Sequence, residues 1–177
     1  AAIADLKAAQ IADWRGDRFK EAKLVFHTPY AARRALDLLG HLDSDATVRM
    51  YLGWLKPLMA LGPYSQALLL DGDFHVQFAY PEESDRNLTP GERRAVQSAF
   101  ENRSVIMTDL ERAGDPPQVI LSLAVPIIVR REGDRDNVPA AGLPPLPIDR
   151  AAAALILRVD ARQGLFNLVS AWPTKSA

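Results

Sequence analysis

The stretch Tyr64-Ser-Gln-Ala-Leu-Leu-Leu-Asp-Gly-Asp-Phe-His-Val-Gln-Phe-Ala-Tyr80 decides how this chain folds. Two segments rich in apolar and β-favouring residues flank Asp71-Gly72, and Asp-Gly is a strong signal for a tight turn between antiparallel strands. The second segment alternates between an apolar and a mixed face, and its apolar set is Phe74, Val76, Phe78 and Tyr80. The sequence therefore predicts a β-hairpin with strands at 64–71 and 74–80.

The residues before the hairpin have the periodicity of helices. Apolar residues recur at spacings of three and four through residues 1–26, and they are Ile11, Trp14, Ala22, Val25 and Phe26. Thr28-Pro29 favours the start of a second helix, and Gly62-Pro63 favours the end of a third. We therefore expect residues 1–63 to form a helical N-terminal segment.

The residues after the hairpin predict a further helix and the remaining strands of the same antiparallel sheet. Thr89-Pro90-Gly91-Glu92 has the form of a helix-capping box, with a helix to about residue 102. Further strands are expected at 104–110, 118–130 and 151–159, a surface loop at 131–147 and a closing helix at 161–171. This order predicts an α+β fold, in which helices are grouped on one face of a five-stranded antiparallel sheet at 64–171. Residues 172–177 are expected to be a tail.

Composition narrows the function classes. The chain has 177 residues, enough for one domain with its own core. Its net charge is −1, and its paired arginines lie close to acids, so a nucleic-acid partner is not expected. It contains no cysteine, which excludes disulfides and thiolate chemistry. A chain that opens on Ala-Ala-Ile-Ala-Asp within a helical pattern is typical of a piece cut from a longer protein.

The motifs of catalysis and metal binding are missing from the sequence. The three histidines have no paired ligand spacing, and no serine lies in a glycine-flanked elbow. No glycine-rich phosphate loop is present. We therefore predict no catalytic residues, no metal site and no cofactor.

A small-molecule pocket is the remaining candidate site. Polar groups on a covered sheet face must be paired or serve a ligand, and amphipathic aromatic residues often line such pockets. On this reasoning the candidate ligand-binding residues are Tyr51, Trp54, His75, Tyr80, Met107, Asp109 and Ser122.

Five segments, taken in order, resemble a known family. They are Leu6-Lys-Ala-Ala-Gln-Ile-Ala-Asp-Trp-Arg-Gly-Asp-Arg18, Leu68-Leu-Leu-Asp-Gly72, Ala124-Val-Pro-Ile127, Leu155-Ile-Leu-Arg-Val-Asp160 and Ser170-Ala-Trp-Pro-Thr174. Together they resemble the extracytoplasmic PAS-like sensor module, of the Cache or PDC type, of bacterial membrane-bound histidine kinases and diguanylate cyclases. The resemblance covers nearly the whole chain.

The resemblance implies a fold, a location and a role. It implies a long N-terminal helix before a PAS-like five-stranded sheet, on the periplasmic side of an inner-membrane protein. It implies that the segment itself is not an enzyme but binds a small molecule and transmits a helix rearrangement across the membrane. Trp172-Pro173-Thr174 would lead into a second module. The chain lacks the Arg-x-Trp-Tyr signature of the amino-acid-binding members.

Three functional hypotheses stay open at the level of sequence. The first is the sensory input domain, which would form a homodimer through the Ile11, Trp14 and Phe26 stripe. The second is a protein-interaction or dimerisation domain of the same fold that binds no ligand and exposes a patch on its first helix or long loop. The third is a small cytoplasmic enzyme, which would need a polar cluster with perturbed pKa values that the sequence does not offer.

Overall fold

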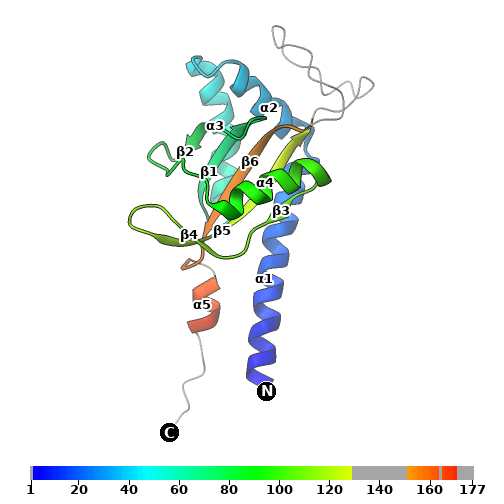
Figure 1. Cartoon of the computed structure of the whole chain (residues 1–177), viewed down its shortest axis with the longest axis vertical. Helices are drawn as coiled ribbons and strands as arrows, with labels where there is room; N and C mark the ends of the chain where they lie inside the picture. The colour runs from blue at the N-terminus through cyan, green and yellow to red at the C-terminus, as the bar shows by residue number, and fades with distance from the viewer. Residues whose placement is uncertain (1, 129–150, 164, 171–177) are drawn as a thin grey trace.

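The computed structural model describes residues 2–128, 151–163 and 165–170, so the expected loop 131–147 and the tail 172–177 lie outside the described residues. As predicted, helices precede the hairpin: α1 (Ala2–His27), α2 (Pro29–Gly40) and α3 (Asp45–Leu61). The strands are β1 (Tyr64–Asp71), β2 (Val76–Tyr80), β3 (Ile106–Met107), β4 (Glu111–Ala113), β5 (Gln118–Ile128) and β6 (Ala151–Asp160). The remaining helices are α4 (Pro90–Asn102) and α5 (Leu165–Ser170) (Figure 1).

The sheet is antiparallel, with the order β2-β1-β6-β5-β3. Over the described residues it has six strands rather than the predicted five, because both β3 and β4 pair with β5 along one edge. The ladder is interrupted at Thr108, whose hydroxyl accepts a hydrogen bond from the backbone N–H of Ser122. A side-chain oxygen thus replaces a backbone acceptor there, and the edge divides into two short strands.

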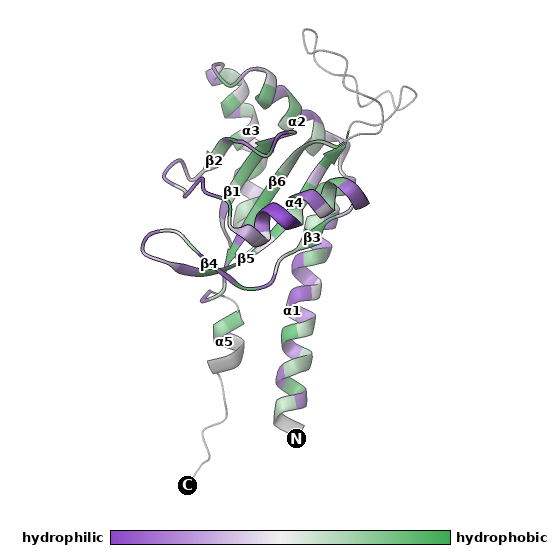
Figure 2. Ribbon diagram, in the orientation of Figure 1, coloured by the Kyte–Doolittle hydropathy of each residue, from purple (hydrophilic) through white to green (hydrophobic). Residues whose placement is uncertain are grey.

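Helices cover both faces of the sheet, which corrects the prediction that they are grouped on one face. Helices α1, α2 and α3 pack on one face, which we call the three-helix face, and α4 packs on the other, the α4 face (Figure 1). The reason is the unbroken run Leu68, Leu69 and Leu70, all 0% exposed, which presents leucines to both sides of β1. Figure 2 shows the central strands as hydrophobic along much of their length. A sheet that is apolar on both faces needs two covers.

The hairpin exists, but its turn is wider than the predicted Asp71-Gly72 turn. The Asp71 carboxylate accepts hydrogen bonds from the backbone N–H groups of Asp73 and His75, so the turn continues to His75. A register shift at Leu69/Leu70 then changes which side the strand presents. Consequently Phe74 and Val76 pack on the α4 face, while Phe78 and Tyr80 pack on the three-helix face. The single apolar face predicted for this segment was wrong.

Local capping signals predicted the starts of α2 and α4 correctly. Thr89 and Glu92 form the predicted capping box at α4, and α2 starts at Pro29 directly after Thr28. Helix α5 begins at Leu165, later than predicted, because the Asp160 carboxylate first accepts the backbone N–H of Arg162 in a turn. Among the described residues no helix is both long and apolar enough to cross a membrane.

Candidate functional site

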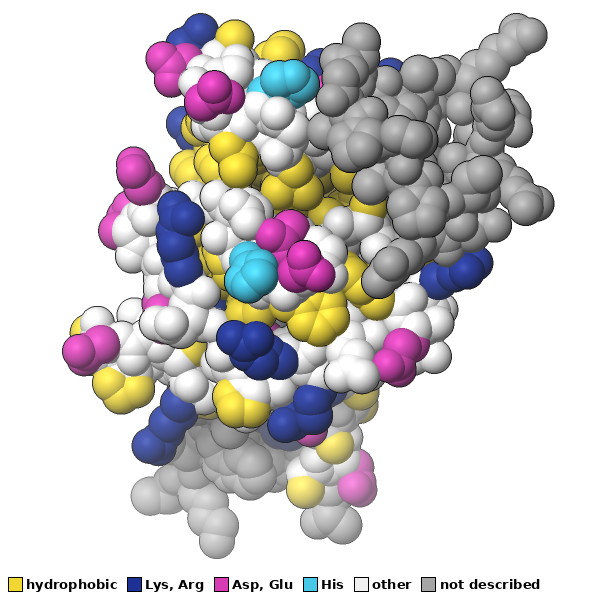
Figure 3. Space-filling model, turned by 45° about the horizontal axis from the view of Figure 1, so that its top comes forward, with side chains coloured by type: hydrophobic (Ala, Val, Ile, Leu, Met, Phe, Trp, Pro, Cys, Tyr) yellow, Lys and Arg dark blue, Asp and Glu magenta, His cyan; other side chains and the backbone are white. Residues whose placement is uncertain are grey.

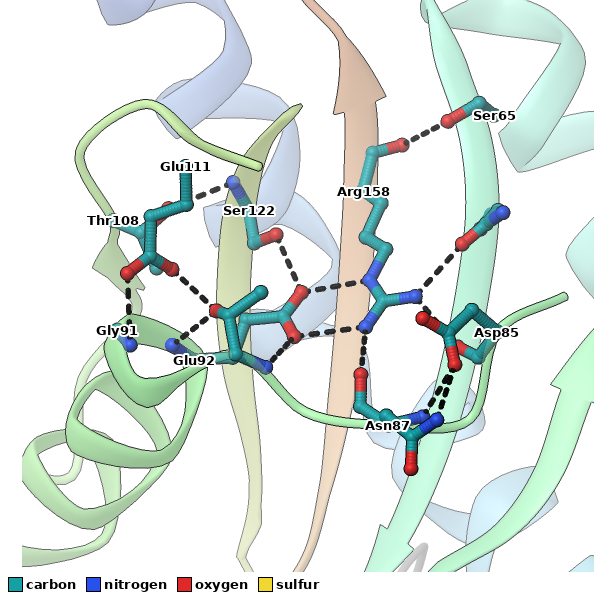
Figure 4. A network of polar contacts seen from close by, with 11 residues as sticks. Ser65, Asp85, Asn87, Gly91, Glu92, Thr108, Glu111, Ser122 and Arg158 are labelled. Carbon is teal, nitrogen blue, oxygen red and sulfur yellow. Dashed lines mark hydrogen bonds and ion pairs between the residues drawn. The ribbon is translucent and has the colours of Figure 1, made fainter. Parts of the chain in front are cut away.

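A buried ion pair lies between the centre of the sheet and α4. Arg158 on β6 is 1% exposed and Glu92 on α4 is 0% exposed. The Arg158 Nε donates to Glu92 Oε1 at 2.7 Å, and its Nη2 donates to Glu92 Oε2 at 2.8 Å (Figure 4). This two-pronged geometry is the strongest arrangement of an arginine on a carboxylate. It joins the start of α4 to the middle of the sheet.

The remaining donors of Arg158 are also used within the protein. Its Nη1 donates to Gln66 Oε1 at 2.8 Å and to the main-chain oxygen of Asp85 at 2.6 Å. Its Nη2 donates to the main-chain oxygen of Asn87 at 2.8 Å. A guanidinium has five N–H donors, and here each one has an acceptor. We call Arg158, Glu92 and the groups that hydrogen-bond to either of them the ion-pair network.

Glu92 is fully engaged as well. Its Oε1 accepts the hydroxyl of Ser122 at 2.7 Å, and its Oε2 accepts the backbone N–H of Thr89 at 2.9 Å. A second carboxylate, Glu111 on β4, accepts the backbone N–H of Gly91 and the hydroxyl of Thr89. Carboxylates are favourable at this position because the first turn of a helix carries unpaired N–H groups and partial positive charge. The start of α4 is thereby bound to both the centre and the edge of the sheet.

A polar cleft of about 520 Å³ opens beside the ion-pair network. Its lining residues are Gln66, Glu83, Asp85, Asn87, Ala113, Gly114, Asp115, Pro116, Gln118 and Ile120. Three of them are acidic, and neither lysine nor arginine is among them. The backbone N–H of Asn87 donates to the Asp85 carboxylate and holds its pKa below the usual range. The cleft therefore presents negative charge at neutral pH.

An apolar groove of about 550 Å³ lies between α1 and α3, on the outer surface of the three-helix layer. Its hydrophobic lining includes Leu24, Trp54, Pro57, Leu58 and Leu61. Leu24 is 70% exposed and Leu61 is 84% exposed. Large hydrophobic side chains this exposed, side by side around a groove, are typical of contact surfaces.

The seven sequence-predicted site residues do not gather in one place. Tyr51 is buried on the three-helix face, with its ring 5.5 Å from Trp54 and 5.4 Å from Phe78. Trp54, Tyr80 and Met107 pack partly against the same core, and Trp54 also lines the apolar groove. Burial raises the pKa of Tyr51.

The other three predicted residues lie elsewhere. His75 is exposed in the hairpin turn, and Asp109 is exposed beyond β3. Ser122 belongs to the ion-pair network on the α4 face. The structure thus associates four of the seven with the three-helix core and only Ser122 with the network. None of the seven lines the polar cleft.

Sequence reasoning missed Arg158 as a site residue and recognised Glu92 only as a helix cap. A signal was present, because Ala154, Ile156 and Arg158 alternate along one face of a strand that is otherwise apolar. A buried arginine on such a face requires a buried acceptor.

Charges of both signs are interspersed on the surface shown in Figure 3, with no continuous basic stripe there.

Comparison with known proteins gives a fold but no sequence relative. No protein-family model matches the chain, and no curated protein matches it by sequence. Solved structures do match. The sensory domain of the Campylobacter jejuni chemoreceptor Tlp3 has a TM-score of 0.60 at 12% identity, over 96% of this chain and 62% of that one.

Two further structures come from pseudomonads. The ligand-binding domain of the Pseudomonas aeruginosa chemoreceptor PctB with L-Arg has a TM-score of 0.55 at 13% identity, over 97% of this chain and 59% of that one. The ligand-binding domain of the Pseudomonas fluorescens chemoreceptor CtaA with L-serine has a TM-score of 0.51 at 15% identity, over 95% of this chain and 60% of that one.

The chain has the fold of these chemoreceptor domains. The α+β, PAS-like architecture expected from the resemblance to extracytoplasmic Cache- or PDC-type modules is therefore confirmed. The chain spans about 60% of the length of the matched chains.

Proposed function

We propose that this chain is an extracytoplasmic sensory domain of a bacterial membrane receptor, and that a small ligand binds in the polar cleft. The observation that carries the proposal is the fold, which matches chemoreceptor ligand-binding domains over 95–97% of the chain. The polar cleft supports it, because convergent polar groups around a concavity are typical of ligand sites. In this role the domain itself has no catalytic activity.

The arrangement of α1 and α5 supports a role in signal transmission. Both helices extend from the same end of the sheet, and α5 packs against α1 (Figure 1). Strand β6 leads into α5, so a shift in the sheet would reach α1 through this contact. We propose that ligand binding biases two arrangements of these helices. The receptor would be a histidine kinase or diguanylate cyclase, as the sequence resemblance implies, or a chemoreceptor like the matched proteins.

A thermal-shift screen of the chain tests the proposed function. The compounds are amines, amino acids, carboxylates and sugars, and saturation at about one hundred times Kd adds roughly 2.7 kcal/mol of stability. We expect one class to raise Tm, and Asp115→Asn to abolish the rise. Asp109→Asn and His75→Ala serve as matched variants, because these residues lie outside the cleft but belong to the set predicted from sequence. If they abolish the rise and Asp115→Asn does not, the polar cleft is the wrong site.

The apolar groove supports a second candidate function, a protein-interaction or dimerisation domain of the same fold. The dimer stripe predicted at Ile11, Trp14 and Phe26 is partly used inside the domain, since Trp14 and Phe26 are partly buried against the core of the three-helix face. The exposed apolar surface lies instead at the apolar groove, where the side chains of Leu24 and Leu61 face outward. Sedimentation of the chain and of Leu24→Ser/Leu61→Ser tests this candidate. Self-association that the double change abolishes, combined with no response in the ligand screen, would favour it.

A further inference from the structure

The polar cleft and the ion-pair network share three residues. Gln66, Asp85 and Asn87 line the cleft, and each also accepts a hydrogen bond from Arg158 at 2.6–2.8 Å. Gln66 uses its side chain for this contact, whereas Asp85 and Asn87 use main-chain oxygens. Arg158 itself lies almost completely buried behind them. One guanidinium therefore holds two different walls of the cleft, the β1 side and the segment 85–87.

The segment 85–87 has internal order of its own. The Asp85 carboxylate accepts both the backbone N–H of Asn87 at 2.9 Å and its side-chain amide at 2.8 Å. These bonds shape the turn, but they do not attach it to the sheet. Arg158, which Glu92 in turn holds by two parallel bonds, attaches the segment to β6. The Asp85 carboxylate also accepts a hydrogen bond from the backbone N–H of Gly114, in the turn before β5. The shape of the turn is thus local, while its placement against the centre of the sheet depends on Arg158.

We infer that Arg158 is the positioning residue of the polar cleft, and that the cleft takes a ligand that donates hydrogen bonds, such as an amine or a guanidinium. The inference deepens the proposed function and rests on it. Every N–H donor of Arg158 already has a protein acceptor, so none remains for a ligand carboxylate. Glu83, Asp85 and Asp115 line the cleft without a lysine or arginine among the lining residues.

Lysine cannot reproduce this positioning. An ammonium group has three donors around a single atom, whereas the guanidinium forks across Glu92, Gln66 and two main-chain oxygens. Arg158→Lys therefore keeps the charge opposite Glu92 and loses the fork. This variant therefore tests whether the forked hydrogen bonds of Arg158 position the cleft, while the positive charge that balances Glu92 is retained.

The mobility of the segment 81–89 tests the positioning role without any ligand. The chain has no cysteine, so Glu82→Cys at an exposed position gives a single site for a spin label. We expect Arg158→Lys to sharpen the spectrum of this label. Arg86→Lys, an exposed arginine in the same segment, is the matched control and should leave the spectrum unchanged. An unchanged spectrum in folded Arg158→Lys overturns the positioning role.

A second variant guards against a failure to fold. Arg158→Met/Glu92→Met removes both charges together and replaces them with apolar side chains of similar volume, a change that folded proteins often tolerate. It should also mobilise the label while retaining cooperative thermal unfolding. A label that stays as immobile as in the parent contradicts the inference in this variant too.

Calorimetric titration tests the ligand class. Agmatine carries an amine and a guanidinium but no carboxylate, and succinate carries two carboxylates and no donor cation. We expect agmatine to bind the chain, and Arg158→Lys to weaken that binding at least tenfold. Tighter binding of succinate than of agmatine overturns the ligand class. Binding of neither compound overturns both the ligand class and the cleft as the sensory site, while the label mobility still decides the role of Arg158.

Discussion

The three-helix face of the sheet is filled with hydrophobic side chains, whereas the α4 face has a smaller hydrophobic cluster beside a buried ion pair. On the three-helix face, stability comes from many small contacts that do not depend on direction. On the α4 face, Arg158 and Glu92 each require the other, because an unpaired charge in the interior is costly. The polar cleft opens beside the directional network, not beside the hydrophobic core. The three-helix face thus contributes bulk stability, and the α4 face fixes the placement of the groups around the polar cleft.

The largest expected effect comes from breaking the ion pair on one side only. Arg158→Met leaves Glu92 buried without its counter-ion, and we expect a loss of about 3–5 kcal/mol in the free energy of unfolding. Adding Glu92→Met should restore most of that loss. Equilibrium unfolding in urea of the parent, both single variants and the double variant measures the coupling. Additive losses in the double variant would contradict the account of the α4 face.

The three-helix face should behave in the opposite way. Leu69 and Leu155 are opposite each other on β1 and β6, and they are 0% and 1% exposed. Leu69→Ala should cost about 3 kcal/mol, because it removes buried surface and leaves a cavity. Adding Leu155→Ala should lower the stability further instead of restoring it. The same urea experiment applies, and a rescue by the second change would show that the two faces do not differ in this respect.

A smaller effect is expected at the start of α4. Thr89→Ala removes the hydroxyl that accepts the backbone N–H of Glu92 and donates to Glu111, and it should cost about 1 kcal/mol. Thr89→Ser retains the hydroxyl and is the matched control. Thermal unfolding of the two variants measures the difference. Equal stability of the alanine and serine variants would mean that the ion-pair network alone holds this end of the helix.

The smallest effect is expected on the outer surface. Leu61→Ser changes a side chain that is 84% exposed, so the free energy of unfolding should stay within about 0.5 kcal/mol of the parent. Thermal unfolding checks this value. A larger loss would show that the apolar groove contributes to the fold itself and is not a free surface.

The features predicted correctly from the sequence depend on residues that are close along the chain. The capping box spans Thr89 to Glu92, and the α2 start depends on Thr28-Pro29. The hairpin was predicted for the same reason, but its turn was not, because the Asp71 carboxylate reaches the N–H of His75 and replaces the tight Asp-Gly geometry. The covering of both sheet faces by helices was not predicted. It depends on Leu68, Leu69 and Leu70, which are buried on both faces of β1, and simple alternation of apolar and polar residues does not predict such burial.

The candidate site escaped sequence reasoning for a different reason. Arg158 and Glu92 are 66 residues apart, and nothing in the local sequence of either indicates the other. Ser122 was identified as a polar residue on a covered face, and it does contact Glu92. The cleft is formed by Gln66, the segment 83–87 and the turn before β5, which meet only after the sheet has formed. Register and long-range pairing decide such a site, and neither is encoded within a short window.

The position of β6 has a consequence for how the chain is made. Among the strands that the structure describes, β6 comes last in sequence, yet it lies between β1 and β5 in the sheet. A ribosome releases β1 and β2 first and β3 to β5 next, so two separate pairings with exposed edges precede their connection. Such late, non-local contacts slow folding and leave intermediates open to aggregation. Synthesis of residues 151–160 ends this interval, and the strand that completes the sheet also brings Arg158 to the carboxylate of Glu92.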